Sequence, residues 1–284
     1  MKKQLVVICD MEGASGIFEH NRMAMRHGSK EWHEYGRECL TSDVLAICNG
    51  ANEYGMDEIL IYDAHFAGEP KPNIIIDKLP KNAKFFDTPD RCFYWRRIRG
   101  QAQVEPFGII TVGQHARYGE ENSYFPHTIQ SPPIKELILN GMNIAEIGQA
   151  VLNFQGVKYV ANIGCKASMK EARELSETVV TIPVKDKKTE WEPSSKETYE
   201  LIKKGIIEGL EKIDTMKSIT IEGPCKFSMK VTDGYEYNPD KAISWKGEFT
   251  DDEAIWYAPS VEIGFEIFNY VREYIVKNND FKKV

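Results

Sequence analysis

The stretch VVICDMEGASG, residues 6–16, decides the first element of the fold, because a run of apolar residues leads directly into two acids, Asp10 and Glu12. Continuous apolar runs are typical of strands buried on both faces, as in a parallel sheet covered by helices. No turn-forming residue separates the run from the acids. The stretch therefore predicts a buried strand that ends at a polar site.

Comparable β-rich runs recur along the chain and alternate with helical patterns. After a first strand at 4–10, strands are expected at 58–65, 83–88, 107–115, 157–164 and 178–184. Helices are expected around 34–54, at 143–155 and after Ser194. This alternation favours an α/β fold, with a mostly parallel sheet and flanking helices in a Rossmann-like three-layer core.

Capping boxes and hairpin patterns supply further local predictions. Three capping boxes mark helix starts: Asn143 with Glu146, Ser168 with Glu171, and Ser194 with Glu197. The helix after Ser194 would have an apolar face made of Tyr199, Ile202, Ile206, Leu210 and Ile213. Two short runs, 127–130 and 135–141, are typical of a β-hairpin inserted ahead of the helix at 143–155.

The polar, proline-containing stretch KDKKTEWEPSS, residues 185–195, is the best candidate for a domain boundary. We predict a metal-binding α/β catalytic domain at 1–190 and a smaller α+β domain at 191–284 that contributes to packing or oligomerisation. In the second domain, 217–223 and 225–231 are expected to be adjacent strands, and the last helix is expected at about 259–277.

The composition disfavours several function classes. The 284 residues are 42% hydrophobic and 28% charged, which is typical of a soluble globular chain. The formal net charge is −7 and the basic residues are dispersed, which disfavours nucleic acid and anionic membranes as partners. The apolar run before Asp10 is too short for a secretory signal, and no stretch is long enough to span a bilayer, so we expect a cytoplasmic protein.

The six cysteines lie far apart and form no C-x-x-C pair. This spacing predicts neither a disulfide framework nor a thiolate zinc site. We expect the cysteines to be reduced and mostly buried as small apolar residues.

Polar side chains follow three of the predicted parallel strands. Asp10 and Glu12 follow the first strand, YDAH supplies Asp63 and His65, and GQH supplies His115. The loop after His115 brings in His127 behind a proline. Residues two apart in a strand point to the same side, and open α/β sheets bind ligands beyond the carboxyl ends of their strands. We therefore expect these groups to converge at one edge of the sheet.

Each of these features also has a structural explanation. Asp10 and Glu12 are compatible with a solvated loop that turns at the glycines after them. A single histidine is more often a packed or surface residue than a ligand. Glu146 occupies the third position of a predicted capping box, which favours glutamate. The functional interpretation depends on the coincidence of all of them at successive strand ends.

Carboxylates combined with imidazoles, and without thiolates, are ligands for zinc or a similar metal. Two divalent ions about 3.5–4 Å apart, bridged by one carboxylate, would neutralise several clustered acids at once. Such a pair turns a bridging water into hydroxide and polarises a carbonyl oxygen, so hydrolysis is the expected reaction. A histidine that is not a ligand, such as His127, would transfer a proton or stabilise the oxyanion.

The same residues resemble a known family. DMEGASG is similar to the opening motif of the DppA-like D-aminopeptidases, the M55 family of dinuclear zinc peptidases. YDAH, VGQHARYG, YFPHTI and NGMNIAEIGQA resemble later motifs of that family, in the same order. The resemblance covers residues 5 to about 180, and five ordered motifs are more specific than any one of them.

The resemblance implies a site and an assembly. Its metal ligands would be Asp10, Glu12, His65, His115 and Glu146, and its catalytic histidine would be His127. Asp10 would bridge two divalent ions, expected to be zinc. The implied protein is a metallo-aminopeptidase that hydrolyses peptide or amide bonds in short peptides, including those that bear D-residues, and that forms a homo-decamer.

Two departures from the family pattern bear on the substrate. Phe66 follows His65 where a smaller or polar residue is usual. GCKAS, residues 164–168, replaces an acidic pair found after the corresponding strand of a D-aminopeptidase of the family. If that pair receives the ammonium group of the substrate, Cys165 and Lys166 would weaken the preference for a free N-terminus and favour an acidic group.

Two other kinds of function remain open on the sequence. One is a magnesium-dependent phosphoryl-transfer enzyme or nucleotide-binding protein, although the chain has neither a P-loop lysine nor a G-x-G-x-x-G after the first strand. The other is a catalytically inert metal-binding homologue, which the altered segment at 164–168 would allow.

Overall fold

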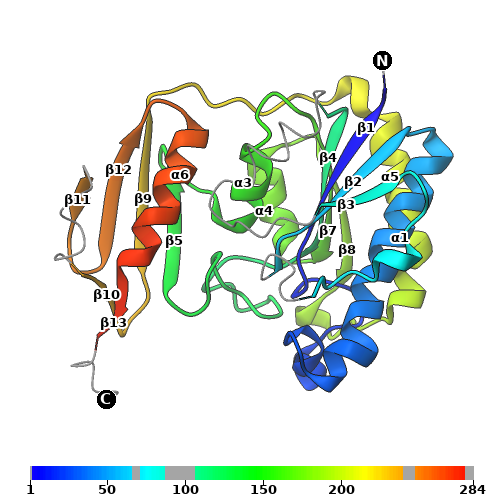
Figure 1. Ribbon diagram of the computed structural model, residues 1–284, viewed down its shortest axis with the longest axis horizontal. Helices are drawn as coiled ribbons and strands as arrows, with labels where there is room; N and C mark the ends of the chain where they lie inside the picture. Colours follow the sequence, from blue (N-terminus) through cyan, green and yellow to red (C-terminus); the bar gives the residue numbers. More distant parts are fainter. Residues whose placement is uncertain (1, 66–70, 87–105, 239–246, 279–284) are drawn as a thin grey trace. The chain divides into compact units, whose positions relative to one another are not determined.

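The computed structural model describes residues 2–65, 71–86, 106–238 and 247–278 (Figure 1). The chain forms two compact units, each of which draws on several segments. Unit 1 comprises residues 1–116, 120–126 and 154–219, and unit 2 comprises residues 117–119, 127–153 and 220–284.

Unit 1 contains a six-stranded sheet whose strands all run parallel. In spatial order the strands are β3 (Ala83–Phe86), β2 (Glu58–Asp63), β1 (Gln4–Cys9), β4 (Gly108–Gln114), β7 (Tyr159–Cys165) and β8 (Val180–Lys185). Every residue of β1, β2, β4 and β7 is buried, as continuous apolar runs require. The six predicted strands and the α/β fold are confirmed.

Helices cover both faces of this sheet. α1 (Arg37–Tyr54) and α5 (Ser195–Glu211) pack side by side on one face, and α4 (Ser168–Leu175) packs on β7 and β8 from the other (Figure 1). Right-handed crossovers that leave the centre of a parallel sheet in opposite directions place their helices on opposite faces. Short helical turns are η1 (Glu19–Met25), η2 (Trp32–Gly36), η4 (Ile76–Lys78), η5 (Lys187–Thr189), η6 (Ile213–Thr215) and η8 (Arg272–Tyr274).

The capping box at Ser194 is confirmed, whereas the other two are wrong. The Ser194 backbone N–H donates to the Glu197 carboxylate at 2.8 Å, and the buried face of α5 contains Ile202, Ile206 and Leu210. α3 (Ala145–Leu152) begins after Ile144 without a side-chain cap, because pairing with β5 takes Asn143 into strand β6. The Ser168 hydroxyl lies inside the first turn of α4 and donates to the Cys165 carbonyl.

Unit 2 is built on an antiparallel sheet. Its strands, in spatial order, are β11 (Gly247–Phe249), β12 (Glu253–Ala258), β9 (Cys225–Val231), β5 (Ile134–Leu139) and β6 (Met142–Asn143). α6 (Val261–Val271) packs on β9 and β12, and the rings of Phe227 and Trp256 stack at 5.3 Å. A separate pair joins β10 (Tyr235–Tyr237) to β13 (Ile275–Lys277).

Three predicted elements of unit 2 differ from the structure. Residues 127–130 form no strand, and β5 pairs instead with β6 and β9. The two prolines that follow, Pro132 and Pro133, lack the N–H that a strand ladder needs. Residues 217–223 form only an isolated bridge through Ser218, and the predicted last helix ends at Val271 before the chain continues into β13.

The predicted division at residue 190 differs from the two compact units. α5 lies beyond residue 190 but belongs to unit 1, because its apolar face packs on α1 and β8. β5 and α3 lie before residue 190 but belong to unit 2, because β5 pairs with β9.

The cysteines that the structure describes are free and buried, as expected: Cys9, Cys39, Cys48, Cys165 and Cys225. Cys92 lies outside the described residues. Among the helices of the described ranges, none has the length and apolar character needed to cross a membrane.

Candidate metal centre

Four of the predicted site residues lie in unit 1, where its parallel strands end. Asp10 follows β1, His65 follows β2 and His115 follows β4. β1 and β4 are neighbours, and the chain leads away from them in opposite directions, to β2 on one side and to β7 on the other. Ligands of open α/β sheets bind at this kind of switch point.

The backbones after β1 and β4 are in direct contact. Asp10 N–H donates to Val112 O at 2.8 Å, and Gly13 N–H donates to Gly113 O at 2.7 Å. A Cβ atom at Gly13 would lie 1.9 Å from Gln114 O, so only glycine allows this approach. The contact fixes the loop that carries Asp10 and Glu12 beside the strand end that carries His115.

The carboxylates and imidazoles of these loops form one cluster. His65 Nδ1 lies 3.3 Å from Asp10 Oδ1 and 3.1 Å from Glu12 Oε2. His115 Nε2 lies 3.4 Å from Asp10 Oδ2. One ligand atom from each of Asp10, Glu12 and His115 lies within 4.8 Å of the others. The two oxygens of Asp10 thus face two different imidazoles, as those of a bridging carboxylate would.

Glu12 reaches the cluster by a route different from the predicted one. We expected the extended conformation to continue to Glu12, but β1 ends at Cys9 and residues 11–13 form a turn. The turn, rather than strand alternation, brings the Glu12 carboxylate to His65.

The other nitrogen of each imidazole faces a backbone carbonyl. His65 Nε2 lies 3.1 Å from Met25 O, and His115 Nδ1 lies 2.8 Å from Ala116 O. A carbonyl only accepts, so each of these nitrogens donates its proton and, in a neutral ring, leaves the lone pair on the nitrogen that faces Asp10. Metal-binding histidines are usually oriented in this way. The donor set therefore fits a divalent metal.

The cluster is buried and strongly coupled. Asp10 is 2% exposed and His115 is also 2% exposed. Burial by itself lowers the pKa of His65, but the Glu12 and Asp10 carboxylates outweigh it and raise the pKa well above its ordinary value. Two buried carboxylates thus attract positive charge to this position, which a divalent ion would also supply.

Asp63 does not join the cluster. Its carboxylate accepts hydrogen bonds from Asn73 N at 2.7 Å and from Asn73 Nδ2 at 3.0 Å, and burial raises its pKa. Asn73 Nδ2 also donates to His65 O at 2.8 Å. Asp63 and Asn73 therefore hold the main chain at His65. No sequence motif marks Asn73 for this role.

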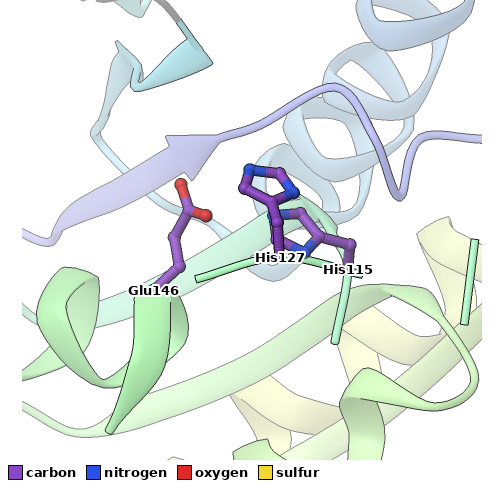
Figure 2. Close-up of side chains that lie close together, drawn as sticks. All are labelled: His115, His127 and Glu146. Atoms are coloured by element: carbon purple, nitrogen blue, oxygen red, sulfur yellow. The ribbon is translucent and has the colours of Figure 1, made fainter. Parts of the chain in front are cut away.

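The remaining two predicted residues lie in unit 2. A ring nitrogen of His127 and a carboxylate oxygen of Glu146 lie within 4.8 Å of each other, and both residues are half-buried. Figure 2 shows the Glu146 side chain extending from α3 beside His127. The N-cap of α3 is Ile144 and not Asn143, so Glu146 does not occupy the third position of a capping box.

The segment that departs from the family pattern follows β7. Cys165 is buried, and Lys166 is exposed with its Nζ 2.6 Å from Asp186 Oδ2. This ion pair lowers the pKa of Asp186 against the opposing effect of burial. Phe66 lies outside the described residues.

Comparisons with known proteins relate the chain to one family. The model of the M55 peptidase family, described as D-aminopeptidase, matches residues 3–246. No curated protein matches the chain in sequence. Among solved structures, the chain is similar to the Zn-dependent D-aminopeptidase DppA from Bacillus subtilis, a self-compartmentalizing protease. The TM-score is 0.80 at 18% identity, and the match covers 95% of this chain and 97% of that one.

Proposed function

Since the chain belongs to the M55 family of D-aminopeptidases and is a metallo-aminopeptidase of that family, we propose that it hydrolyses peptide or amide bonds of short peptides at a centre of two zinc ions. The proposed substrates are short peptides, including those that bear D-residues. The solved relative is described as zinc-dependent, which supports zinc as the metal.

The proposed ligands are Asp10, Glu12, His65, His115 and Glu146, with Asp10 as the bridge. One observation carries this assignment: His65 and His115 each donate one ring N–H to a backbone carbonyl and direct the other nitrogen at a different oxygen of Asp10. Glu146 of unit 2 is proposed as the fifth ligand.

His127 is proposed as the catalytic histidine and not as a ligand. Bound zinc supplies an activated water and polarises the scissile carbonyl. His127 would either hydrogen-bond the oxygen on which negative charge develops or take a proton from the attacking water and pass it to the leaving amine. Its half-buried position beside Glu146 supports this role, because the ring lies near one proposed ligand and stays accessible to a substrate.

The assembly and location of the enzyme are part of the same proposal. The solved relative is described as self-compartmentalizing, which supports an oligomer, and we extend this to a homo-decamer in the cytoplasm. A decamer would have a mass near ten times the 32.5 kDa of one chain. Sedimentation equilibrium of the purified protein measures that mass, and a monomer would contradict the decamer.

The central experiment combines metal analysis with an assay on matched D- and L-aminoacyl dipeptides. The proposal expects two zinc ions per chain and release of the N-terminal residue, lost on chelation and restored by zinc. A protein that binds its metal but hydrolyses neither peptide series would favour the catalytically inert alternative. Thermal stabilisation by a nucleotide, without bound zinc, would favour the phosphoryl-transfer alternative.

A further inference from the structure

Lys185, the last residue of β8, is a fully buried ammonium in unit 1. Its Nζ donates hydrogen bonds to three backbone carbonyls: to Glu12 O at 2.7 Å, to Ala14 O at 2.9 Å and to Ile17 O at 2.5 Å. All three carbonyls belong to residues 12–17, which we call the metal loop. A lysine ammonium has three donors, so the metal loop satisfies all of them.

Aromatic rings enclose the same ammonium. The ring centroids of Phe18, Tyr124 and Phe125 lie 5.4, 5.3 and 6.0 Å from Lys185 Nζ. Rings at this range attract a cation through their electron-rich faces. The ammonium therefore has a position defined by the loop carbonyls and by the rings.

The metal loop is also held through Ser15. Asp43 of α1 accepts a hydrogen bond from Ser15 N at 2.9 Å, and the Thr198 hydroxyl of α5 donates to the Ser15 hydroxyl at 2.8 Å. Asp43 is fully buried, and its charge opposes the lowering of the Lys185 pKa by burial. The metal loop thus lies between a buried cation that binds its carbonyls and a buried acid that binds one of its N–H groups.

A buried charge is unfavourable unless its donors are satisfied, and an apolar side chain of similar length would fill the same space without that cost. A lysine at this position therefore does more than fill space. Lys185 is connected to the candidate metal centre through Glu12. The Glu12 carbonyl accepts a hydrogen bond from Lys185 Nζ, and the Glu12 carboxylate lies 3.1 Å from His65 Nδ1.

We propose that Lys185 is a positioning residue for the metal centre: its ammonium fixes the main chain of the metal loop and thereby the place of the Glu12 carboxylate. Lys185 touches neither the metal nor the substrate. The inference rests on the proposed function, since it assigns Glu12 as a ligand. Groups that orient a ligand typically change metal affinity by about 10- to 100-fold when they are removed.

The test uses the whole chain with Lys185→Met, which keeps most of the length of the side chain and removes its three donors. Zinc affinity is measured by competition with a chelating indicator, and cobalt-loaded protein reports the coordination geometry through its visible absorption. We expect zinc to bind about 10- to 100-fold more weakly. We also expect an altered cobalt spectrum at saturating metal and a fall in kcat larger than the change in KM.

A matched control separates this effect from a general loss of stability. Ile206→Val removes one buried methylene group from α5, away from the metal loop, and should lower Tm while leaving zinc affinity and the cobalt spectrum unchanged. A Lys185→Met protein with wild-type zinc affinity and cobalt spectrum overturns the inference, whatever its Tm.

A second variant covers the case in which Lys185→Met does not fold. Lys185→Gln is neutral but keeps two donors, so we expect it to weaken zinc binding less than Lys185→Met would. Unchanged zinc affinity in a folded Lys185→Gln protein also overturns the inference. Failure of the proposed function would be seen separately, because the wild-type protein itself would then bind no stoichiometric zinc. In that case the proposed function and the inference about Lys185 would both be discarded.

Discussion

At the scale of single residues, the candidate site depends on which ring nitrogen each imidazole presents. One ring nitrogen of His65 faces Met25 O, and one ring nitrogen of His115 faces Ala116 O. In both rings the other nitrogen faces the Asp10 carboxylate. If the same ring nitrogen faced water or an apolar group instead of a carbonyl, its surroundings would not decide which nitrogen carries the proton. The main chain therefore orients both imidazoles in the way that the proposed ligand role requires.

The proposed role of His127 can be tested by His127→Ala. Because His127 is assigned a proton-transfer role and no metal, we expect bound zinc to be unchanged and kcat to fall by about 10²- to 10⁴-fold. Metal analysis and steady-state kinetics measure the two quantities. His33→Ala, at an exposed histidine, serves as the control. Near-wild-type turnover of His127→Ala would remove His127 from the mechanism.

Lys166 offers a test of substrate choice. Its side chain is exposed and its Nζ is paired with Asp186, so it can present positive charge to a substrate. We expect Lys166→Ala to lower kcat/KM for acidic dipeptides relative to neutral ones by several-fold. Lys170→Ala removes an exposed lysine of α4 and should leave the ratio unchanged. An unchanged ratio in Lys166→Ala would discard the preference for an acidic group.

Asp43 makes the stability of unit 1 depend on pH. Burial raises the pKa of Asp43 from 3.8 to about 6. A raised carboxyl pKa stabilises the folded state fully below pH 3.8, and this stability is lost as pH rises through 6, a change of about 3 kcal/mol. Urea unfolding at several pH values should therefore show Asp43→Asn gaining about 3 kcal/mol on the wild-type protein between about pH 3 and pH 7.5, of which about 1.4 kcal/mol falls above pH 5. A difference that stays constant with pH would contradict this.

At the scale of elements, the contact between the ends of β1 and β4 decides where the proposed ligands of unit 1 meet. Asp10 N–H pairs with Val112 O and Gly13 N–H pairs with Gly113 O, so the first turn after β1 continues the sheet pairing. The close approach replaces the strand alternation that we expected to bring Asp10 and Glu12 together. Backbone packing, and not side-chain spacing, sets the site at this level.

Gly13→Ala tests that contact. The added Cβ would lie 1.9 Å from the Gln114 carbonyl oxygen, and neither backbone can move away easily. We expect a loss of about 3 kcal/mol or more in the free energy of unfolding, or a loss of metal binding, measured by urea unfolding and metal analysis. Gly28→Ala meets no atom within 4 Å and should cost only about 1 kcal/mol, through its positive φ. Equal effects of the two substitutions would contradict the assignment.

At the scale of the whole molecule, metal binding should contribute to stability, because the proposed ligands come from loops far apart in the chain. A ligand present at 100 times its Kd stabilises the state that binds it by about 2.7 kcal/mol. We therefore expect a chelator to lower Tm and abolish activity, and zinc to restore both. Magnesium at the same concentration is the control. A Tm that is insensitive to chelation would contradict a structural contribution of the metal.

The sequence by itself determined the local features of the protein. The continuous apolar runs predict β1, β2, β4 and β7 correctly, and the capping box at Ser194 predicts the start of α5. These features depend on residues within a few positions of one another, so periodicity and capping chemistry are sufficient to find them. The residue types at three strand ends also indicated a metal site, because their chemistry is independent of the fold.

Only the tertiary structure decided the partners that lie far apart in the chain. β5 pairs with β9 rather than with residues 127–130, and Lys185 binds the carbonyl of Glu12 across 173 positions. Asn73 holds Asp63 and the main chain at His65 without any motif to mark it. Such contacts depend on where the folded backbone brings a donor beside an acceptor. Residue type and spacing leave many donors and acceptors equally available, so the path of the chain chooses among them.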